Sequence, residues 1–335
     1  MRIRVLRMAR EPLSFQNYRE HVCSALASLG VDLLSAMPGA PGDLCAGADL
    51  LWDPGVGMGR LPAALFRARG PLVVTVHGLR AFSLPLAEIA SRPLERAQMA
   101  LARWRRRREW RRLLPRVSRI IAVSRYGAGE VERAFGVEPG RVRAIHHGVD
   151  HALFRPEGER EAFARPYFLH VSSYQPKKNV ARILAAHAAL DPAARPGLRL
   201  VVPGHPEVAR APDVLLVREP LPAAALARLY RGARAFLFPS LHETFGMPIL
   251  EAMACGCPVL TSPQTGCGEV ADDAAYRVDP RSSGALAAAL ERLASDDRLC
   301  ADLAQRGIAR AAAFRWERCA EQHLQLFDEL LRARR

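Results

Sequence analysis

Short apolar runs alternate along the whole chain with longer segments in which apolar residues recur every three or four positions. In the first half, runs that predict buried strands cover residues 3–8, 31–34, 49–52, 72–76, 120–123 and 141–145. In the second half they cover residues 167–171, 198–202, 214–217, 235–238, 258–260 and 276–278. This alternation predicts an α/β fold with one doubly wound parallel sheet in each half.

The segments between these runs predict helices over residues 15–30, 86–114, 126–135, 180–190, 223–230, 248–254, 283–294 and 297–312, with a last helix after Trp316. Ser124 is expected to cap the helix over 126–135. The charged stretch 150–166, which contains proline and glycine, predicts a linker between two domains. Ligands of such sheets bind beyond the carboxyl ends of the strands, so we expect a site in a cleft between the domains.

Length and composition limit the protein class. The chain has 335 residues, of which 50% are hydrophobic and 24% charged, which excludes a disordered or collagen-like protein. The N-terminus carries charge at every second residue and predicts a strand, and we expect neither a secretory signal nor a transmembrane helix. Seven cysteines without a CxxC pair indicate reduced thiols in a cytosolic protein.

The net charge of +14 is unevenly distributed, since residues 1–160 carry +11 of it. The segment from Arg103 to Arg119 contains nine arginines and one acidic residue, with Trp104 and Trp110 among them. Such a helix suits an anionic membrane surface or another polyanionic partner, and a solvated helix is the alternative. Nucleic acid is not expected, because no zinc finger or RNA-recognition signature accompanies the charge.

Lysine occurs at only two positions, Lys177 and Lys178, although the chain has 48 basic residues. Lysine binds phosphate as a compact point charge, unlike the planar fork of arginine. The adjacent pair therefore predicts a phosphate-binding position, and chance retention of two lysines is the alternative.

Several common phosphate and cofactor motifs are excluded. The glycines of residues 55–59 follow a GxGxG spacing instead of GxGxxG, which argues against a dehydrogenase. Neither lysine follows a glycine, which excludes a P-loop. No Asp-x-Asp occurs to hold Mg²⁺ or Mn²⁺ on a diphosphate, so we expect no metal and no cofactor.

The most informative segment is residues 236–259, FLFPSLHETFGMPILEAMACGCPV. A buried strand leads into a loop with a glycine, and Pro248 stands in the first turn of a short helix. The helix N-terminus and nearby amides predict a site for an anion or for sugar hydroxyls, with the amides at Phe245, Gly246 and Met247.

Two glutamates flank this loop. We place Glu243 before the helix and Glu251 in its first turn, so that both carboxylates face the same opening. Carboxylates accept hydrogen bonds from sugar and ribose hydroxyls. The alternative for Glu251 is that it only complements the helix dipole.

This segment resembles glycosyltransferase family 4, retaining transferases of GT-B fold, and most of all its bacterial mannosyltransferase and hexosyltransferase members. The family's E-x7-E spacing runs here from Glu243 to Glu251. The resemblance extends over about residues 70 to 320 and includes VVTVHGL, VSRYGAGEV, HHGVDHALFRP, VSSYQPKKN, EVADDAAYRVDP and FRW.

The resemblance implies two Rossmann-like domains. Residues 1–155, completed by a C-terminal helix over 316–335, would form the acceptor domain, and residues 156–315 would form the nucleotide-sugar donor domain. In this family His77 and Glu243 would be the catalytic residues that hold the transferred sugar. The alternative for His77 is a structural role, as a core histidine whose hydrogen bonds are made within the protein.

The same resemblance assigns the remaining site residues. Glu251 would bind the nucleotide ribose, and Lys178 with Lys177 would bind the diphosphate. The loop at Phe245, Gly246 and Met247 would contact sugar or phosphate. Two features depart from the family pattern: Ser172 stands where many members carry an arginine, and residues 10–17 replace a glycine-rich loop.

The expected reaction is retaining transfer of a hexose from a nucleotide diphosphosugar, with GDP-mannose favoured and UDP-hexose as the alternative. The acceptor would be a hydroxyl of a saccharide or lipid-linked molecule in envelope polysaccharide or glycolipid synthesis. We expect a cytoplasmic protein, peripheral on the inner face of the cytoplasmic membrane. The alternatives are a GT-B epimerase or hydrolase, and a non-catalytic sugar-nucleotide binding protein, which would need neither Glu243 nor His77.

Overall fold

The computed structural model describes residues 1–7, 13–37, 43–56, 61–79, 82, 84–90, 92–206 and 211–334. The chain forms two compact units, which we call unit 1 (Met1–Gly148 with Arg315–Arg335) and unit 2 (Val149–Phe314). The C-terminal helix is therefore part of unit 1. None of the described helices is both long and apolar enough to cross a bilayer.

Unit 1 contains a sheet of six parallel strands in the order β2-β1-β3-β4-β5-β6. Its strands are β1 (Arg2–Leu6), β2 (Asp32–Ala36), β3 (Leu50–Val56), β4 (Leu72–Val76), β5 (Arg119–Ala122) and β6 (Val142–Ala144). Its helices are α1 (Leu13–Ser28), α3 (Leu86–Ile89), α4 (Pro93–Leu113), α5 (Arg125–Phe135) and α12 (Trp316–Arg332), with 3-10 turns η1 (Ala63–Arg67), η2 (Leu114–Arg116) and η3 (Pro139–Arg141).

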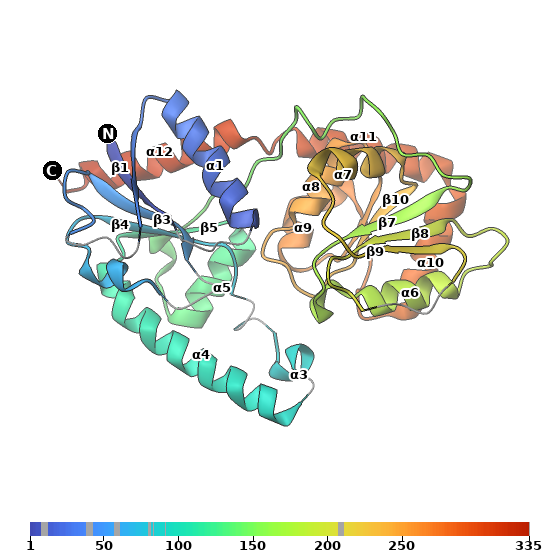
Figure 1. The fold of residues 1–335 in the computed structure, drawn as a ribbon, viewed down its shortest axis with the longest axis horizontal. Coiled ribbons are helices and arrows are strands. Elements are labelled where there is room, and N and C mark those ends of the chain that lie inside the picture. The colour runs from blue at the N-terminus through green and yellow to red at the C-terminus, as the bar shows by residue number, and fades with distance from the viewer. Residues whose placement is uncertain are drawn as a thin grey trace. The chain divides into compact units, whose positions relative to one another are not determined.

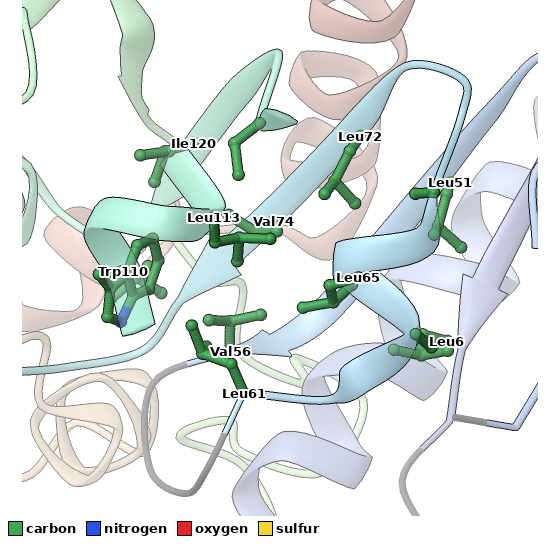
Figure 2. Packing of buried hydrophobic residues seen from close by; sticks show 14 of the residues in the cluster. Leu6, Leu51, Val56, Leu61, Leu65, Leu72, Val74, Trp110, Leu113 and Ile120 are labelled. Carbon is green, nitrogen blue, oxygen red and sulfur yellow. The ribbon is translucent and has the colours of Figure 1, made fainter. Parts of the chain in front are cut away.

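Helices cover both faces of this sheet. In Figure 1, α1 and α12 lie along one face, and α4 and α5 lie on the opposite side. Because side chains alternate along a strand, each strand supplies apolar residues to both layers. Figure 2 shows the cluster of buried residues on the α4 side of the sheet, which includes Leu72 and Val74 of β4, Leu65 of η1, and Trp110 and Leu113 of α4.

Unit 2 contains a second sheet of six parallel strands, in the order β12-β11-β10-β7-β8-β9. The strands are β7 (Tyr167–Val171), β8 (Gly197–Val201), β9 (Val214–Val217), β10 (Ala235–Phe238), β11 (Val259–Thr261) and β12 (Tyr276–Arg277). The helices are α6 (Val180–Ala188), α7 (Ala223–Gly232), α8 (Met247–Ala254), α9 (Thr265–Ala271), α10 (Ser283–Ser295) and α11 (Asp297–Ala311), with 3-10 turns η4 (Pro176–Lys178) and η5 (Asp272–Ala274).

The strand order of unit 2 determines where a ligand can bind. From β7 the chain proceeds outward to β8 and β9, and then returns to the other side of β7 for β10, β11 and β12. The order reverses between β7 and β10, which are hydrogen-bonded neighbours. The loops after these two strands leave in opposite directions, and the space beyond their carboxyl ends is the usual binding position in such sheets.

The predicted fold class and all twelve predicted strands are confirmed, within a few residues at their ends. The predicted cap is also confirmed, because Ser124 Oγ accepts a hydrogen bond from Gly127 N at 2.8 Å. Unit 2 begins a few residues before the predicted division after residue 155, and residues 315–335 belong to unit 1.

Two local predictions were wrong, and one helix was missed. The helix expected over residues 86–114 is two helices, α3 and α4, because Arg92 precedes Pro93 and is extended (φ −92°, ψ 141°). Helix α9 was not predicted. The stretch 150–166 is not a free linker, since Phe154 in it is buried and packs on Tyr230 of α7 within unit 2.

The glycine run at residues 55–59 and the loop at residues 10–17 are only partly within the described residues. Gly55 belongs to strand β3, and residues 57–59 lie outside the described ranges. Residues 10–12 also lie outside them, and residues 13–17 form the first turn of α1.

Candidate functional site

Two loops meet beyond the carboxyl ends of β7 and β10. The amide of Leu241, after β10, donates to the carbonyl of Lys177, after β7, at 2.8 Å. Asn179 also joins the loops, because its Nδ2 donates to the carbonyl of Pro239 at 3.0 Å and to that of Pro280 at 2.7 Å. Asn179 has φ 66°, a left-handed conformation that asparagine tolerates better than most residues. These contacts fix the two adjacent lysines against the loop that carries Glu243.

Lys177, Lys178 and Glu243 form an ion triad at this position. Lys178 Nζ lies 2.7 Å from Glu243 Oε1, and Lys177 Nζ lies 3.3 Å from Oε2. All three side chains are largely buried, with 10–13% of their surface exposed. Lys178 Nζ also lies 4.9 Å from the centre of the Phe238 ring, within the range of a cation–π interaction. The only two lysines of the chain thus share one carboxylate.

The charge state of Glu243 follows from these neighbours. Burial alone raises the pKa of a carboxyl, but the charges and hydrogen bonds of Lys178 and Lys177 outweigh it and hold the pKa of Glu243 at about 2. Glu243 is therefore ionised at neutral pH, and the triad carries a formal charge of +1. A site of this kind favours an anion with more than one negative charge.

The loop after Glu243 is shaped by two glycines. Gly246 has φ 114°, which a residue with a side chain rarely adopts, and it immediately precedes α8. Gly266 at the start of α9 lies so close to the loop that an added Cβ would be 2.2 Å from the Thr244 carbonyl oxygen. This close approach brings the Gly266 amide to the Glu243 carbonyl at 2.8 Å. Phe245, in this loop, is buried, and Met247 is the first residue of α8.

Glu251 lies on α8, and its position corrects one prediction. Helix α8 begins at Met247 and has no acidic residue in its first turn, so Glu251 lies in the second turn. It is therefore too far from the helix N-terminus to act mainly on the dipole, which falls off within one turn. Tyr230 Oη donates to Glu251 Oε2 at 3.0 Å. Burial raises the pKa of Glu251 to about 7, although the Tyr230 hydrogen bond acts in the opposite direction.

Ser172, where the family pattern has an arginine, is buried and bonded within unit 2. His170 Nδ1 lies 2.7 Å from the Leu237 carbonyl, so this nitrogen carries a proton and donates it. His170 Nε2 then accepts from the Ser172 hydroxyl at 2.8 Å. Burial lowers the pKa of His170 to about 4, which is consistent with this neutral form. Ser172 thus supplies no cation to the triad.

His77 follows β4 in unit 1, in a different unit from the triad. Its Nε2 donates to the Pro54 carbonyl at 2.7 Å, which leaves Nδ1 as an acceptor. The half-buried ring stacks on Phe15 at 4.1 Å between ring centres, and Tyr18 meets it edge-on at 4.6 Å. Burial lowers the pKa of His77 to about 4, so at neutral pH the side chain can accept a hydrogen bond but does not serve as an acid.

The support of His77 by helix α12 was not predicted from the sequence. His323 Nδ1 donates to the Cys319 carbonyl at 2.7 Å, and its Nε2 therefore accepts from Tyr18 Oη, also at 2.7 Å. Tyr18 has 1% of its surface exposed, and its ring forms one wall around His77. The C-terminal helix thus fixes the ring that packs against His77.

Helix α4 presents a second candidate surface in unit 1. Only its last turn enters the core, through Trp110 and Leu113. On the opposite side of the helix, at spacings of seven and three residues, lie Leu94, Leu101 and Trp104, which are 70%, 46% and 57% exposed. An open hollow along this side is lined by arginines at 105, 108 and 112, among others.

Of the predicted site residues, the structure brings together Lys177, Lys178 and Glu243 by direct contact. Phe245, Gly246 and Met247 lie on the loop and helix that follow Glu243, and Glu251 lies one turn further along. Within the described ranges, no group of three or more His, Cys, Asp or Glu side chains is placed to hold a metal ion.

Solved structures share the fold of the whole chain. Sucrose-phosphate synthase from Thermosynechococcus elongatus has a TM-score of 0.75 at 20% identity, and the match covers 99% of both chains. The Anabaena protein HepE, solved in complex with UDP and glucose, has a TM-score of 0.70 at 16% identity over 98% of this chain and 100% of that one. These similarities establish the GT-B fold.

Curated relatives match more than half of the sequence. O-antigen chain mannosyltransferase B of Escherichia coli is 30% identical over 233 residues, which are 63% of this chain and 60% of that protein. The MMP alpha-(1->4)-mannosyltransferase of Mycolicibacterium hassiacum is 29% identical over 287 residues, 78% of this chain and 66% of that protein. The chain thus spans less than two thirds of the length of these relatives.

Two family models match adjacent parts of the chain. The model of glycosyl transferases group 1 matches residues 154–310, and the model of Glycosyltransferase Family 4 matches residues 46–153. The first includes the triad and Glu251, and the second includes His77. With both matches and the two parallel sheets, the chain belongs to glycosyltransferase family 4.

Proposed function

We propose that this protein transfers a hexose, with retention of anomeric configuration, from a nucleotide diphosphosugar to a hydroxyl of a saccharide or lipid-linked acceptor. The triad of Lys177, Lys178 and Glu243 at the β7–β10 switch point carries this proposal. GDP-mannose is the favoured donor and UDP-hexose the alternative. The names of two relatives, both mannosyltransferases, support this preference.

Each residue of the proposed donor site has a role that its environment supports. Lys178 and Lys177 bind the diphosphate, and the loop amides at Gly246 and Met247 with the α8 N-terminus add partial positive charge. Glu243, ionised at neutral pH, accepts hydrogen bonds from hydroxyls of the transferred sugar. Glu251 accepts hydrogen bonds from the nucleotide ribose.

The proposed chemistry is a front-side displacement at the anomeric carbon. The bond from this carbon to the diphosphate oxygen breaks, and the bond to the acceptor oxygen forms on the same face. The departing diphosphate takes the acceptor's proton. Lys178 and the α8 N-terminus stabilise the negative charge that develops on the diphosphate. His77, neutral and with Nδ1 as an acceptor, orients a hydroxyl of the sugar.

We place the acceptor on unit 1 and the protein at the cytoplasmic face of an anionic membrane, where it acts in envelope polysaccharide or glycolipid synthesis. Residues 103–119 supply the positive charge for this contact. The exposed Leu94, Leu101 and Trp104 supply apolar groups at the same surface of α4. In this contact the arginines would lie near the lipid phosphates, and the three exposed apolar side chains among them would reach the acyl boundary.

A donor panel tests the proposed function directly. GDP-mannose, UDP-glucose and UDP-N-acetylglucosamine are incubated with the protein, and release of the nucleoside diphosphate is measured with and without candidate acceptors. We expect release to depend on GDP-mannose and to increase with acceptor. Acceptor-independent hydrolysis would instead favour a hydrolase, and binding without turnover would favour a sugar-nucleotide binding protein.

The same assay tests whether the reaction needs a metal. Since two lysines and a helix N-terminus serve the diphosphate in this proposal, we expect full turnover in excess EDTA. A strict requirement for added Mn²⁺ or Mg²⁺ would contradict the proposed role of the lysines as the leaving group's counter-charge.

A further inference from the structure

We propose that Tyr230 is a positioning residue of the donor site, which holds one oxygen of the Glu251 carboxylate so that the other is available to the nucleotide ribose. This inference rests on the proposed role of Glu251 in ribose binding. It deepens that role, because it explains how a half-buried carboxylate, which has no ion-pair partner among the described residues, is kept ready to accept hydrogen bonds.

The packing of Tyr230 leaves its ring little freedom to move. The residue lies near the end of α7 and has 0% of its surface exposed. Phe236 of β10 meets its ring at 83° with 5.2 Å between ring centres, and Phe154 meets it at 64° with 6.2 Å. Its hydroxyl is directed at α8, where it donates to Glu251 Oε2 at 3.0 Å. A rigid ring with one directed donor is suited to fix a carboxylate.

Tyr230 acts only as a donor across the range of an ordinary assay. Burial and the neighbouring Glu251 raise the pKa of Tyr230 well above its usual value, so the phenol stays protonated. Glu251 has a pKa of about 7, because its burial favours the neutral form and the Tyr230 hydrogen bond only partly offsets this. The ionised carboxylate therefore depends on the Tyr230 hydroxyl near neutral pH.

Other titratable groups around Glu251 act on it more weakly or are bonded elsewhere. Cys255 caps the C-terminus of α8, and burial raises its pKa to about 12, so it stays neutral. Cys257 is likewise buried and neutral. On α11, which packs against α8, Arg306 donates to the Asp273 carbonyl and Arg310 to main-chain carbonyls of α9. On α7, Arg231 donates to the carbonyls of Glu159 and Arg155, so Tyr230 is the α7 group that bonds to Glu251.

The proposal predicts a pH-dependent defect when the hydroxyl is removed. In Tyr230→Phe the ring packing is kept, but the carboxyl loses its donor and its pKa rises above 7. Glu251 is then mostly protonated at pH 7 and accepts the ribose hydroxyls less well. At about pH 9 the carboxyl ionises in both proteins, and the difference shrinks. A purely structural effect of the substitution would not recover at high pH.

The experiment compares Tyr230→Phe with Tyr167→Phe and the wild type. Tyr167 is a matched control, because its buried hydroxyl also donates to α7, to the Leu229 carbonyl at 2.7 Å, without contacting Glu251. Calorimetry measures binding of GDP and of UDP between about pH 6 and pH 9. We expect Tyr230→Phe to bind the preferred nucleotide roughly five- to tenfold more weakly at pH 7 and within about twofold of wild type at pH 9, as expected for loss of a hydrogen bond to a charged group. Tyr167→Phe should show no such pH dependence.

Two further measurements separate this inference from the proposed function. Glu251→Gln should weaken nucleotide binding at about pH 8–9, where the wild-type carboxyl is ionised, and less so towards about pH 6, where most of it is protonated. If it does not, the ribose role fails, whereas NMR of ¹³C-labelled glutamate still reports whether Tyr230→Phe raises the pKa of Glu251. If Glu251→Gln weakens binding but Tyr230→Phe equals wild type at pH 7, or is weaker by one constant factor at all pH values, the positioning role of Tyr230 is overturned.

Discussion

The two glutamates of the E-x7-E motif differ in protonation because their neighbours differ. Glu243 has two ammonium groups within ion-pair distance and a pKa of about 2. Glu251 is served by a tyrosine hydroxyl and has a pKa of about 7. One is thus ionised throughout the physiological range, and the other changes charge within it. The environment of each carboxylate therefore determines its role.

The first prediction concerns Lys178. Replacement by Ala should weaken nucleotide-diphosphosugar binding and slow turnover together, because the diphosphate is charged in both the ground and the transition state. Replacement by Arg should also reduce both, since the planar guanidinium does not fit the position of a compact ammonium between Glu243 and the Phe238 ring. Steady-state kinetics measures both effects. Full activity of Lys178→Arg would contradict the idea that lysine is retained here for phosphate.

The second prediction concerns competition within the triad. Glu243 occupies both lysines with its carboxylate, so Glu243→Gln should leave them more available to a free nucleoside diphosphate. We expect this variant to bind GDP or UDP about three- to tenfold more tightly than wild type. The reason is that the lysines no longer lose their attraction to Glu243 when they bind the diphosphate. Its turnover of the nucleotide sugar should nevertheless fall, because the sugar loses an acceptor. Glu251→Gln is the control and should bind the nucleotide less well, and equal or weaker binding by Glu243→Gln would contradict the competition.

At the scale of residues, the family resemblance assigned Lys178 and Glu243 to one donor site, but the sequence did not predict that they form an ion pair. Lys178 and Glu243 each follow a strand, and the carboxyl ends of neighbouring parallel strands meet at one edge of a sheet. The Tyr230–Glu251 contact was not predictable in this way, because it depends on how α7 and α8 pack against each other. The bond between Ser172 and His170 depends likewise on burial, which a serine in a motif does not indicate.

Elements were predictable where an apolar pattern is uninterrupted. The strands β4, β7 and β10 satisfy this condition, since each is a short run of almost entirely buried residues. Helix α9 fails it, because its seven residues include Gly266 and Gly268, which lower helix propensity. Both glycines are needed for close packing, since an added Cβ would lie within 2.2 Å of a carbonyl oxygen at each position. Tertiary packing thus determines this helix.

The third prediction concerns helix α12 as an element of unit 1. Phe327 on this helix is fully buried, with its ring 5.9 Å from that of Trp52 on β3. Phe327→Ala should lower the free energy of unfolding of unit 1 by about 3–5 kcal/mol, because it leaves a cavity in the core. Hydrogen exchange should become faster in α1 and β3 and stay unchanged in unit 2. Leu290→Ala on α10 is the matched control, and its effect should be confined to unit 2.

At the scale of the whole molecule, the two units share an architecture but differ in charge. Each contains a six-stranded parallel sheet, and the position of each sheet's switch point follows from the strand order. Residues 1–160 nevertheless carry +11 of the net +14. The sequence predicted this asymmetry directly, but not that the exposed apolar residues of α4 lie opposite the turn that enters the core. That arrangement follows from Trp110 and Leu113, which fix the rotation of the helix.

The last prediction follows from this asymmetry. Liposome flotation should recover the protein with vesicles that contain anionic lipid and not with neutral ones, and added salt should release it, since each basic residue near such a surface contributes about 1 kcal/mol. Substituting arginines 105–108 by Gln should abolish recovery, and Trp104→Ala should reduce it. The control removes the same charge from exposed positions of unit 2, through Gln at Arg160, Arg277, Arg281 and Arg298. If that control loses binding to the same extent, net charge and not the surface of α4 holds the protein at the membrane, and equal recovery on neutral vesicles would contradict the electrostatic contact.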